Sequence, residues 1–323
     1  MSTTKIEQES QPLNRVSKVS DVGNPKTLHL VGIGVTHSIA PAMHNFIAKS
    51  LGLPWTFHAT ECATVEEAVV IARSPETHGL VVTMPYKNSI MKHLDGLDPL
   101  ATTLNACNNV YRDRQNPEVL RGTNTDWLGI KGCLLENCDN EQRASQAMAG
   151  LIVGAGGASR AAVYTLSAQL SCSVIYILNR DEGEVAALIH DSQQLSPVPN
   201  IIHIQTLQQA KTLASPYYIV CCVPDLEPQS DTEKMVTASL TELLSRPEKG
   251  VLLDMCFKPR RTRIIKLAER LGWPTVEGTH VIGYQIEEQW RLWAGEEKTK
   301  HLDRDGAWKI LLKSADESQA INF

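Results

Sequence analysis

The stretch that decides the fold is Leu151-Ile-Val-Gly-Ala-Gly-Gly-Ala-Ser-Arg-Ala161, which has the pattern of a strand, a glycine turn and the start of a helix. Gly154 permits the tight turn, and Gly156 has no side chain to keep a pyrophosphate away from the backbone. The helix after the turn offers free N–H groups and the positive end of its dipole. The stretch therefore predicts a dinucleotide site. The alternative is a glycine turn between a buried strand and a helix that binds no ligand.

Strands and helices alternate on both sides of this turn. The predicted strands are Leu28–Gly34 with its glycine turn, Trp55–Ala59, Gly79–Met84, Asn108–Asp113, Leu120–Thr125, Gly150–Val153 and Ser173–Leu178. The predicted helices are Ala40–Leu51, Val65–Ala72, Lys87–His93, Pro99–Leu104, Trp127–Glu136, Ser159–Leu170, His280–Trp293 and Ala307–Lys313. A polar connection is expected at Asn137–Gln146, and Glu182–His190, Tyr217–Val223, Val251–Met255 and Arg263–Leu271 continue the alternation. This order predicts a mainly parallel α/β fold.

The corner after the strand Ser173–Leu178 bears on the choice of cofactor. Asn179 and Arg180 stand there. An acidic residue at this place typically holds the ribose 2′-hydroxyl of NAD, whereas an arginine suits the 2′-phosphate of NADP. Acidic residues follow at once, beginning with Asp181, and would oppose a phosphate unless they point away. We expect NADP or NAD, with a slight preference for NADP. In the alternative, Arg180 only caps a surface loop.

The composition is that of an ordinary globular protein. The 323 residues predict two domains, and 42% of them are hydrophobic and 21% charged. The formal net charge of -5 is unlike the basic surface that general nucleic-acid binding needs. Apolar runs such as Ile219–Val223 are far short of the roughly 20 residues of a membrane span. Residues 1–26 are polar and lack apolar periodicity, which predicts a flexible tail.

The eight cysteines are interpreted as structural thiols. None of them forms a CxxC pair, and no nearby histidines complete a ligand set, so we expect no metal site. Most lie in apolar stretches, where a reduced cysteine behaves as a small core residue in a reducing compartment. The N-terminus also lacks the apolar segment of a signal peptide. We therefore expect a cytoplasmic monomer or homodimer that binds a small-molecule substrate and neither nucleic acid nor membrane.

Further motifs form an ordered series along the chain. They are His37-Ser-Ile-Ala-Pro-Ala-Met-His-Asn45, Val81-Val-Thr-Met-Pro-Tyr-Lys87, Ala106-Cys-Asn-Asn-Val110, Gly122-Thr-Asn-Thr-Asp126, Asp254-Met-Cys-Phe-Lys-Pro259 and Gly278–Gln285 with Leu292-Trp-Ala-Gly295. Together with the glycine turn and Asn179-Arg180, the series resembles the shikimate and quinate dehydrogenase family, whose patterns are HSxSPxxHN, NVTxPxK, AVNTV, GxNTD and DxxYxP. The resemblance covers nearly the whole chain from about Leu28.

The resemblance implies a two-domain fold with its active site in the cleft between the domains. Residues 27–125 and 285–323 would form an N-terminal α/β substrate domain, and residues 126–284 a C-terminal Rossmann-like domain, with the last helices returning to the first domain. By position, Lys87 and Asp126 would be the catalytic pair. Oxidising a ring hydroxyl needs a group that takes the proton while hydride leaves to the nicotinamide, and a partly desolvated lysine oriented by an aspartate suits this task. The alternatives are a solvated helix start for Lys87 and a helix N-cap for Asp126.

The resemblance also implies the ligand contacts. The substrate-binding residues would be Ser38, Thr83, Asn108, Thr125 and Gln285. The cofactor-binding residues would be Gly154, Ala155, Gly156, Gly157, Ala158, Asn179, Arg180, Val223 and Gly278.

Several positions on the substrate side depart from the family pattern. Ala40 replaces the second hydroxyl of HSxSP, and Val81 replaces the asparagine of NVTxPxK. Phe257 replaces the tyrosine of DxxYxP, Asn109 replaces a threonine, and Cys221-Cys-Val-Pro224 replaces an asparagine-alanine-threonine-serine run. A substrate hydroxyl that faces Val81 would lose its hydrogen-bond partner. We therefore expect a less polar or reshaped substrate pocket.

Two classes of function remain open on the sequence. One is an enzyme that reversibly oxidises a ring hydroxyl of a shikimate- or quinate-like acid, or of a different cyclic polyol, with NAD(P). The other is a metabolite-sensing or regulatory protein that keeps the same fold. The presence of both Lys87 and Asp126 favours the enzyme, because a sensor has little need of a proton-transfer pair.

Overall fold

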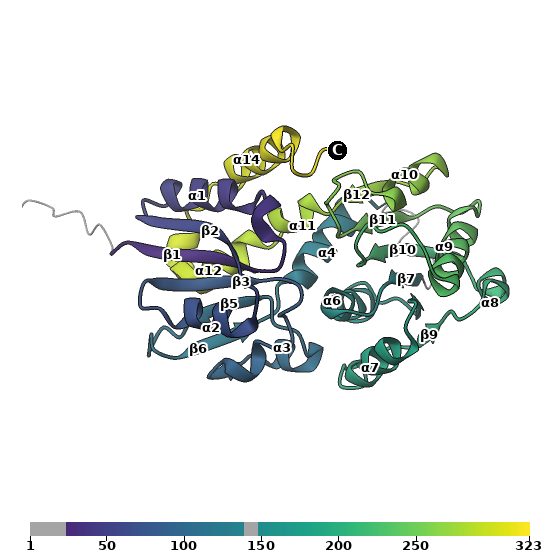
Figure 1. Cartoon of the computed structure of the whole chain (residues 1–323), viewed down its shortest axis with the longest axis horizontal. Helices are drawn as coiled ribbons and strands as arrows, with labels where there is room; N and C mark the ends of the chain where they lie inside the picture. Colours follow the sequence, from purple (N-terminus) through teal and green to yellow (C-terminus); the bar gives the residue numbers. More distant parts are fainter. Residues whose placement is uncertain (1–23, 139–147) are drawn as a thin grey trace, which may run out of the picture.

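The computed structural model describes residues 24–138 and 148–323 and consists of two α/β domains, each built on a six-stranded sheet (Figure 1). We call these the N-terminal sheet and the C-terminal sheet. The predicted two-domain α/β architecture is confirmed. The expected tail lies outside the described residues as far as position 23, and so does most of the polar connection at Asn137–Gln146. The first strand already begins at Lys26, the last residue of the range that was expected to be tail.

The N-terminal sheet is mixed rather than fully parallel. Its strands are β1 Lys26–Gly32, β2 Trp55–Glu61, β3 Thr77–Val82, β4 Gly96–Leu97, β5 Asn109–Arg112 and β6 Leu120–Thr123, in the order β2-β1-β3-β5-β6-β4. Strand β1 runs parallel to β2 and β3, whereas β5 runs antiparallel to both β3 and β6. The loop between β5 and β6 is too short for the crossover that a parallel pair requires, so the two strands form a hairpin.

Helices from both ends of the chain cover the N-terminal sheet. They are α1 Ala40–Ser50, α2 Val65–Arg73, α3 Pro99–Leu104, α12 Ile286–Ala294, α13 Glu296–Thr299 and α14 Arg304–Glu317. Pro41 lies in the first turn of α1, where its missing N–H costs no hydrogen bond. Leu28, Met43, Trp290 and Leu311 belong to one buried cluster, which unites β1, α1, α12 and α14. The last helices therefore complete the core of the N-terminal domain, as Figure 1 shows.

The C-terminal sheet is entirely parallel. Its strands are β7 Ala149–Val153, β8 Val174–Leu178, β9 Ile201–His203, β10 Pro216–Cys221, β11 Val251–Asp254 and β12 Thr275–Glu277. Its helices are α4 Asp126–Glu136, α6 Gly157–Tyr164 with a following π-turn at Thr165–Gln169, α7 Glu182–Ser192, α8 Leu207–Thr212, α9 Asp231–Leu244, α10 Arg263–Arg270 and α11 Thr279–Gly283. The order β12-β11-β10-β7-β8-β9 is that of a Rossmann fold, in which nucleotides bind where the order reverses, here between β7 and β10.

Two predicted helices differ from the structure. The helix expected at Lys87–His93 is a series of turns that ends in a 3-10 turn, because the Lys87 carbonyl accepts a hydrogen bond from the Cys107 N–H (2.7 Å) instead of extending a helix. The helix expected at His280–Trp293 is broken at Tyr284 and Gln285 into α11 and α12. The elements that the sequence analysis did not predict are strands β4, β9 and β12 and helices α8, α9 and α13.

The buried imidazole of His44 makes stability depend on pH. His44 accepts a hydrogen bond from Trp290 Nε1 (3.1 Å) and stacks on Phe57, with ring centroids 4.2 Å apart. Burial lowers the pKa of His44 to about 3 from 6.5, so the unfolded chain binds a proton below pH 6.5 that the folded chain does not. The free energy of unfolding therefore falls as the pH drops from 6.5 towards 3, by at most about 1.4 kcal/mol per pH unit from this group.

Urea unfolding at pH 7 and pH 5 checks this contribution. We expect His44→Gln to lose less stability between the two pH values than the unchanged chain does, because glutamine cannot be protonated. An equal loss in both proteins would show that His44 does not carry the effect.

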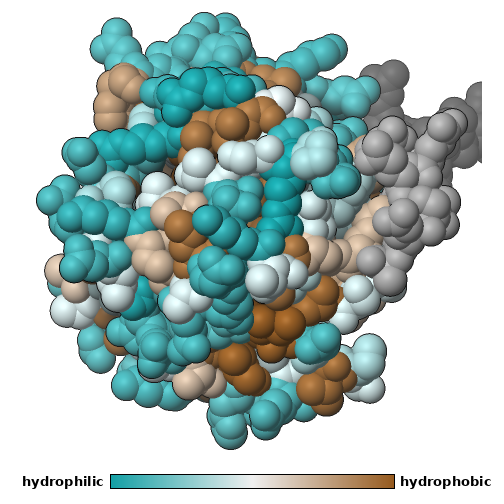
Figure 2. Space-filling model, turned by 90° about the vertical axis from the view of Figure 1, so that its right-hand side faces the viewer, coloured by the Kyte–Doolittle hydropathy of each residue, from teal (hydrophilic) through white to brown (hydrophobic). Residues whose placement is uncertain are grey.

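The outer face of the C-terminal domain is largely hydrophilic. Figure 2 shows this face, where teal covers most of the surface and brown areas are interspersed. The apolar side of α9 is turned inward, since Leu240 and Leu243 are buried against the C-terminal sheet. Within residues 24–138 and 148–323, no helix is long and apolar enough to cross a membrane. All eight cysteines are free thiols.

Candidate functional site at the junction of the two domains

A buried ion pair joins the two domains. Lys87 follows β3 of the N-terminal sheet, and Asp126 is the first residue of α4. The Lys87 Nζ lies 2.5 Å from Asp126 Oδ2, and the two side chains are only 15% and 6% exposed. Thr125, not Asp126, occupies the N-cap position of α4. Asp126 is therefore not the N-cap of this helix, which was the alternative interpretation of this residue. Its carboxylate contacts Lys87 instead.

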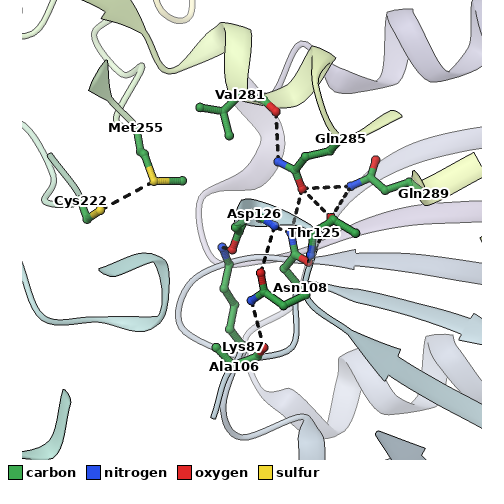
Figure 3. A network of polar contacts seen from close by, with 11 residues as sticks. Lys87, Ala106, Asn108, Thr125, Asp126, Cys222, Met255, Val281, Gln285 and Gln289 are labelled. Carbon is green, nitrogen blue, oxygen red and sulfur yellow. Dashed lines mark hydrogen bonds and ion pairs between the residues drawn. The ribbon is translucent and has the colours of Figure 1, made fainter. Parts of the chain in front are cut away.

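An amide and hydroxyl network holds the second oxygen of the Asp126 carboxylate (Figure 3). Asn108 Nδ2 donates to Asp126 Oδ1 and to Gln285 Oε1, at 2.9 Å in each case. Asn108 Oδ1 in turn accepts from the Thr125 N–H (2.6 Å). The Thr125 hydroxyl donates to Gln285 Oε1 (2.6 Å). Since every member is buried, this network fixes the orientation of the carboxylate beside the Lys87 ammonium.

Gln285 reaches the network because the chain bends between α11 and α12. Its Nε2 donates to the Val281 carbonyl (3.1 Å), which leaves Oε1 directed at Asn108 and Thr125. The approach of α11 to α4 depends on Gly129, where an added Cβ would lie 2.6 Å from the Val281 side chain. The Gln285 side chain therefore points into the network because the helix is broken at this residue.

The glycine turn lies beside Lys87. Gly154 has φ +111°, a conformation that L side chains rarely adopt, whereas a Cβ at Gly156 would meet nothing within 4 Å. No side chain caps the start of α6, which leaves the first N–H groups of this helix available to a ligand. A Cβ at Gly157 would lie 3.5 Å from the Lys87 side chain. The turn therefore has the form that a pyrophosphate needs, and it adjoins the Lys87–Asp126 pair.

The other expected cofactor residues surround this turn. Val223 lies against Gly154, and Gly278 packs on the Met255 carbonyl at the end of β11. Ala155 and Ala158 belong to the turn and to the start of α6. Asn179 donates to the Asp181 carbonyl (3.0 Å) and to Glu184 Oε2 (2.9 Å), while Arg180 makes an ion pair with Glu233 of α9. Arg180 is therefore paired with a carboxylate, which the sequence did not predict.

Two expected substrate residues lie outside the hydrogen-bonded network. Ser38 accepts from the Ala40 N–H (3.3 Å), and Thr83 follows β3 with its backbone N–H bonded to Val31. Three of the departures from the family pattern share one location. Ala40, Val81 and Phe257 all belong to or pack against the apolar cluster of β1, α1, α12 and α14.

The structure adds three residues that the sequence did not single out. Asn124 donates to the Ala106 carbonyl (3.0 Å) and accepts from the Asp126 N–H (3.0 Å), so it fixes the start of α4. Gln289 donates to Thr125 Oγ1 (3.3 Å) from the next turn of α12. Arg160 donates to the Ala155 carbonyl (3.0 Å) across the glycine turn. The position of Arg160 inside the glycine motif was a usable signal, whereas nothing local marked Gln289.

Cys222 faces the ion pair from the C-terminal sheet. Figure 3 shows it beside Met255, with its Sγ 3.7 Å from the Met255 Sδ, on the opposite side of the site from Asn108. Burial raises the pKa of the Cys222 thiol to about 12, so the thiol is neutral at pH 7. The Lys87–Asp126 pair consequently has no thiolate beside it.

The fold and the site define a two-domain NAD(P)-dependent oxidoreductase. Residues 30–110 match the model of the shikimate dehydrogenase substrate binding domain. The chain is 33% identical over 291 residues to the quinate dehydrogenase of Emericella nidulans, and the match covers 83% of this chain and 88% of that protein. The chain therefore belongs to the shikimate and quinate dehydrogenase family.

A second relative agrees with this assignment, and a solved structure shares the fold. The pentafunctional AROM polypeptide of Eremothecium gossypii is 36% identical over 280 residues, which cover 84% of this chain but only 17% of that polypeptide. The quinate dehydrogenase from Corynebacterium glutamicum, solved in complex with NAD, has a TM-score of 0.71 at 21% identity, with 90% of this chain and 100% of that chain covered. This last match shows the shared fold.

Proposed function

We propose that the chain catalyses the reversible NAD(P)-dependent oxidation of a ring hydroxyl in a quinate- or shikimate-like acid. The observation that carries the proposal is the position of the buried Lys87–Asp126 pair directly beside the glycine turn, with Gly157 in contact range of Lys87. A proton-handling pair next to a nicotinamide is what removal of hydride from a secondary alcohol requires. In this proposal residues 27–125 and 285–323 bind the substrate, and residues 126–284 bind the cofactor.

Lys87 and Asp126 handle the proton in the proposed reaction. The Lys87 ammonium first releases one proton to solvent; as the amine, its Nζ then takes up the proton of the ring hydroxyl, while Asp126 keeps the Nζ in place through its Oδ2. Asn108 stabilises the Asp126 carboxylate by donating to its other oxygen (2.9 Å). NAD(P), when bound at the glycine turn, supplies the acceptor for the hydride.

The substrate is proposed to lie between the network and an apolar wall. Ser38, Thr83, Asn108, Thr125 and Gln285 supply the polar contacts of the proposed site. The wall is formed by Ala40, Val81 and Phe257, which belong to or pack against one apolar cluster. These three side chains offer no hydrogen-bonding group, whereas the family pattern has a hydroxyl or an amide at each position. We infer that the preferred ring presents a less polar edge to this wall, which leaves quinate, shikimate and related cyclic hydroxy-acids as the candidates.

The cofactor is proposed to contact the turn and the strand ends around it. The turn residues are Gly154, Ala155, Gly156, Gly157 and Ala158. The flanking residues are Asn179, Arg180, Val223 and Gly278. A cytoplasmic location and a monomeric or homodimeric state stay predictions from the sequence.

The purified chain should reduce the nicotinamide when it is given a suitable acid. We expect a rise in absorbance at the band of the reduced nicotinamide with quinate or shikimate and with NAD or NADP, tested as four pairs. Extending the series to further cyclic hydroxy-acids identifies the preferred ring. Tight binding of these acids without turnover for any pair would instead favour a metabolite sensor.

A further inference from the structure

Arg180 is held by a carboxylate from a distant part of the chain. It stands just after β8, and its side chain is 62% exposed. Its guanidinium nevertheless contacts Glu233 Oε1, which α9 supplies after β10. A guanidinium and a carboxylate in contact form a charge-assisted hydrogen bond. Any anion that approaches Arg180 therefore competes with Glu233.

The carboxylate of Glu233 is fixed in position by the start of α9. Its Oε2 accepts from the backbone N–H groups of Gln229 (2.8 Å) and Ser230 (3.0 Å), and the Ser230 hydroxyl accepts from the Glu233 N–H (3.2 Å). This is a complete capping box. The backbone hydrogen bonds, together with Arg180, lower the pKa of Glu233 to about 2, so the carboxylate is charged at neutral pH.

The residues that follow Arg180 in the chain at this corner are acidic. Asp181 caps α7 by accepting from the Glu184 N–H (2.9 Å), and the Glu184 carboxylate accepts from Asn179. In a Rossmann fold the adenosine ribose lies at the end of the second strand, which is β8 here. A 2′-phosphate dianion at this place would meet Arg180, which already pairs with Glu233, and the carboxylates of Asp181 and Glu184. A 2′-hydroxyl is uncharged and can donate a hydrogen bond to a carboxylate.

We propose that Glu233 selects the cofactor, and that by occupying Arg180 it makes the chain prefer NAD to NADP. This inference rests on the proposed function, because it assumes that a nicotinamide dinucleotide binds at the glycine turn. It reverses the slight preference for NADP that Arg180 suggested in the sequence. The selecting residue lies in α9, outside the strand and turn where the choice is usually made.

Glu233→Gln tests the proposal without disturbing the helix. Glutamine also serves at this position of a capping box, so only the charge is removed. Dissociation constants of NAD⁺ and NADP⁺ are measured by calorimetry with no substrate present. We expect the unchanged chain to bind NAD⁺ more tightly, and the variant to shift the ratio towards NADP⁺ by roughly 10- to 100-fold, since a hydrogen bond to a charged group is worth about 1.5–3 kcal/mol.

Two control variants separate this role from a general effect of charge. Glu242→Gln removes the same charge on the same helix, about 13 Å further along its axis, and should leave the ratio unchanged. In the double variant Arg180→Gln with Glu233→Gln, the gain for NADP⁺ should largely disappear, because the freed cation is absent.

Three results would overturn the proposal. These are an unchanged ratio in Glu233→Gln, a preference of the unchanged chain for NADP⁺, and a gain that persists without Arg180. Binding of neither dinucleotide would refute this proposal and the proposed function together. Normal cofactor binding without turnover of any acid would count against the proposed function alone.

Discussion

Lys87→Ala is expected to lower turnover by about 10²–10⁴ while the affinity for the cofactor stays similar. In the proposed reaction the Lys87 Nζ, as the amine, accepts the hydroxyl proton, so alanine leaves no base at this position. The parts of Lys87 that approach the Gly157 position are its Cβ and Cδ, which carry no charge, so we expect little change in cofactor binding. Steady-state kinetics give the turnover, and calorimetry gives the dissociation constant of the cofactor. Unchanged turnover in this variant would contradict the assignment of Lys87.

A double variant guards against loss of the fold. Lys87→Ala leaves the Asp126 carboxylate buried without its cation, which is costly. In Lys87→Ala with Asp126→Asn, both charges are gone, so we expect higher thermal stability than in the single variant and equally low turnover. If the double variant regained activity, the loss in the single variant would reflect folding and not proton transfer.

Gly156→Val is expected to weaken cofactor binding by more than about 100-fold while the melting temperature stays the same. The space beside Gly156 is open, and its φ of -81° is allowed for any residue, so the fold accepts a side chain there. The valine would occupy the path by which a pyrophosphate approaches the backbone, and loss of these N–H contacts costs several hydrogen bonds to a charged group. Calorimetry and thermal melting measure the two quantities.

Gly154→Ala should behave differently and serves as the comparison. Its φ of +111° is strained for alanine, and the new Cβ would lie 3.0 Å from the Val223 side chain. We expect the melting temperature to fall, because the native conformation at this position is incompatible with a side chain. Normal cofactor affinity in Gly156→Val would show that the cofactor does not bind at this turn.

Local signals in the sequence were sufficient for much of the fold. The strand, glycine turn and helix around Gly154 were predicted correctly, and so were α1 with Pro41 in its first turn and α3. In each of these elements, the residues that start or stop it lie within a few positions of its ends. Helix α9 was missed although Ser230 and Glu233 carry the spacing of a capping box, so this signal was available.

Other features depend on contacts between distant residues. The pairing of β5 with β3 joins strands that no hairpin connects, and no short window records it. The antiparallel pairing of β5 with β6, in contrast, follows from their short loop. The break before α12 depends on Gln285 and its bond to Asn108, 177 residues away. The apolar periodicity runs through both helices, so a continuous helix was the natural expectation.

The sequence predicted which residues belong to the candidate site but not how they contact one another. The motif order pointed to Lys87 and Asp126, and the structure brings their charged groups to 2.5 Å. The sequence could not indicate that Arg180 is neutralised by Glu233, because the two residues come from different strand–helix units. The proposed preference for NAD therefore depends on the packing of α9 against the end of β8, which the sequence does not show.

The most direct test of the account follows the hydride itself. Quinate and shikimate carrying deuterium on the ring carbon to be oxidised are incubated with the protein and with NAD⁺ or NADP⁺, and the reduced cofactor is examined by mass spectrometry. We expect reduced nicotinamide that carries the deuterium, formed by the unchanged chain and at least 100-fold more slowly by Lys87→Ala, since turnover should fall by about 10²–10⁴. Absence of labelled cofactor with every acid and cofactor pair, while the acids still bind, would contradict it.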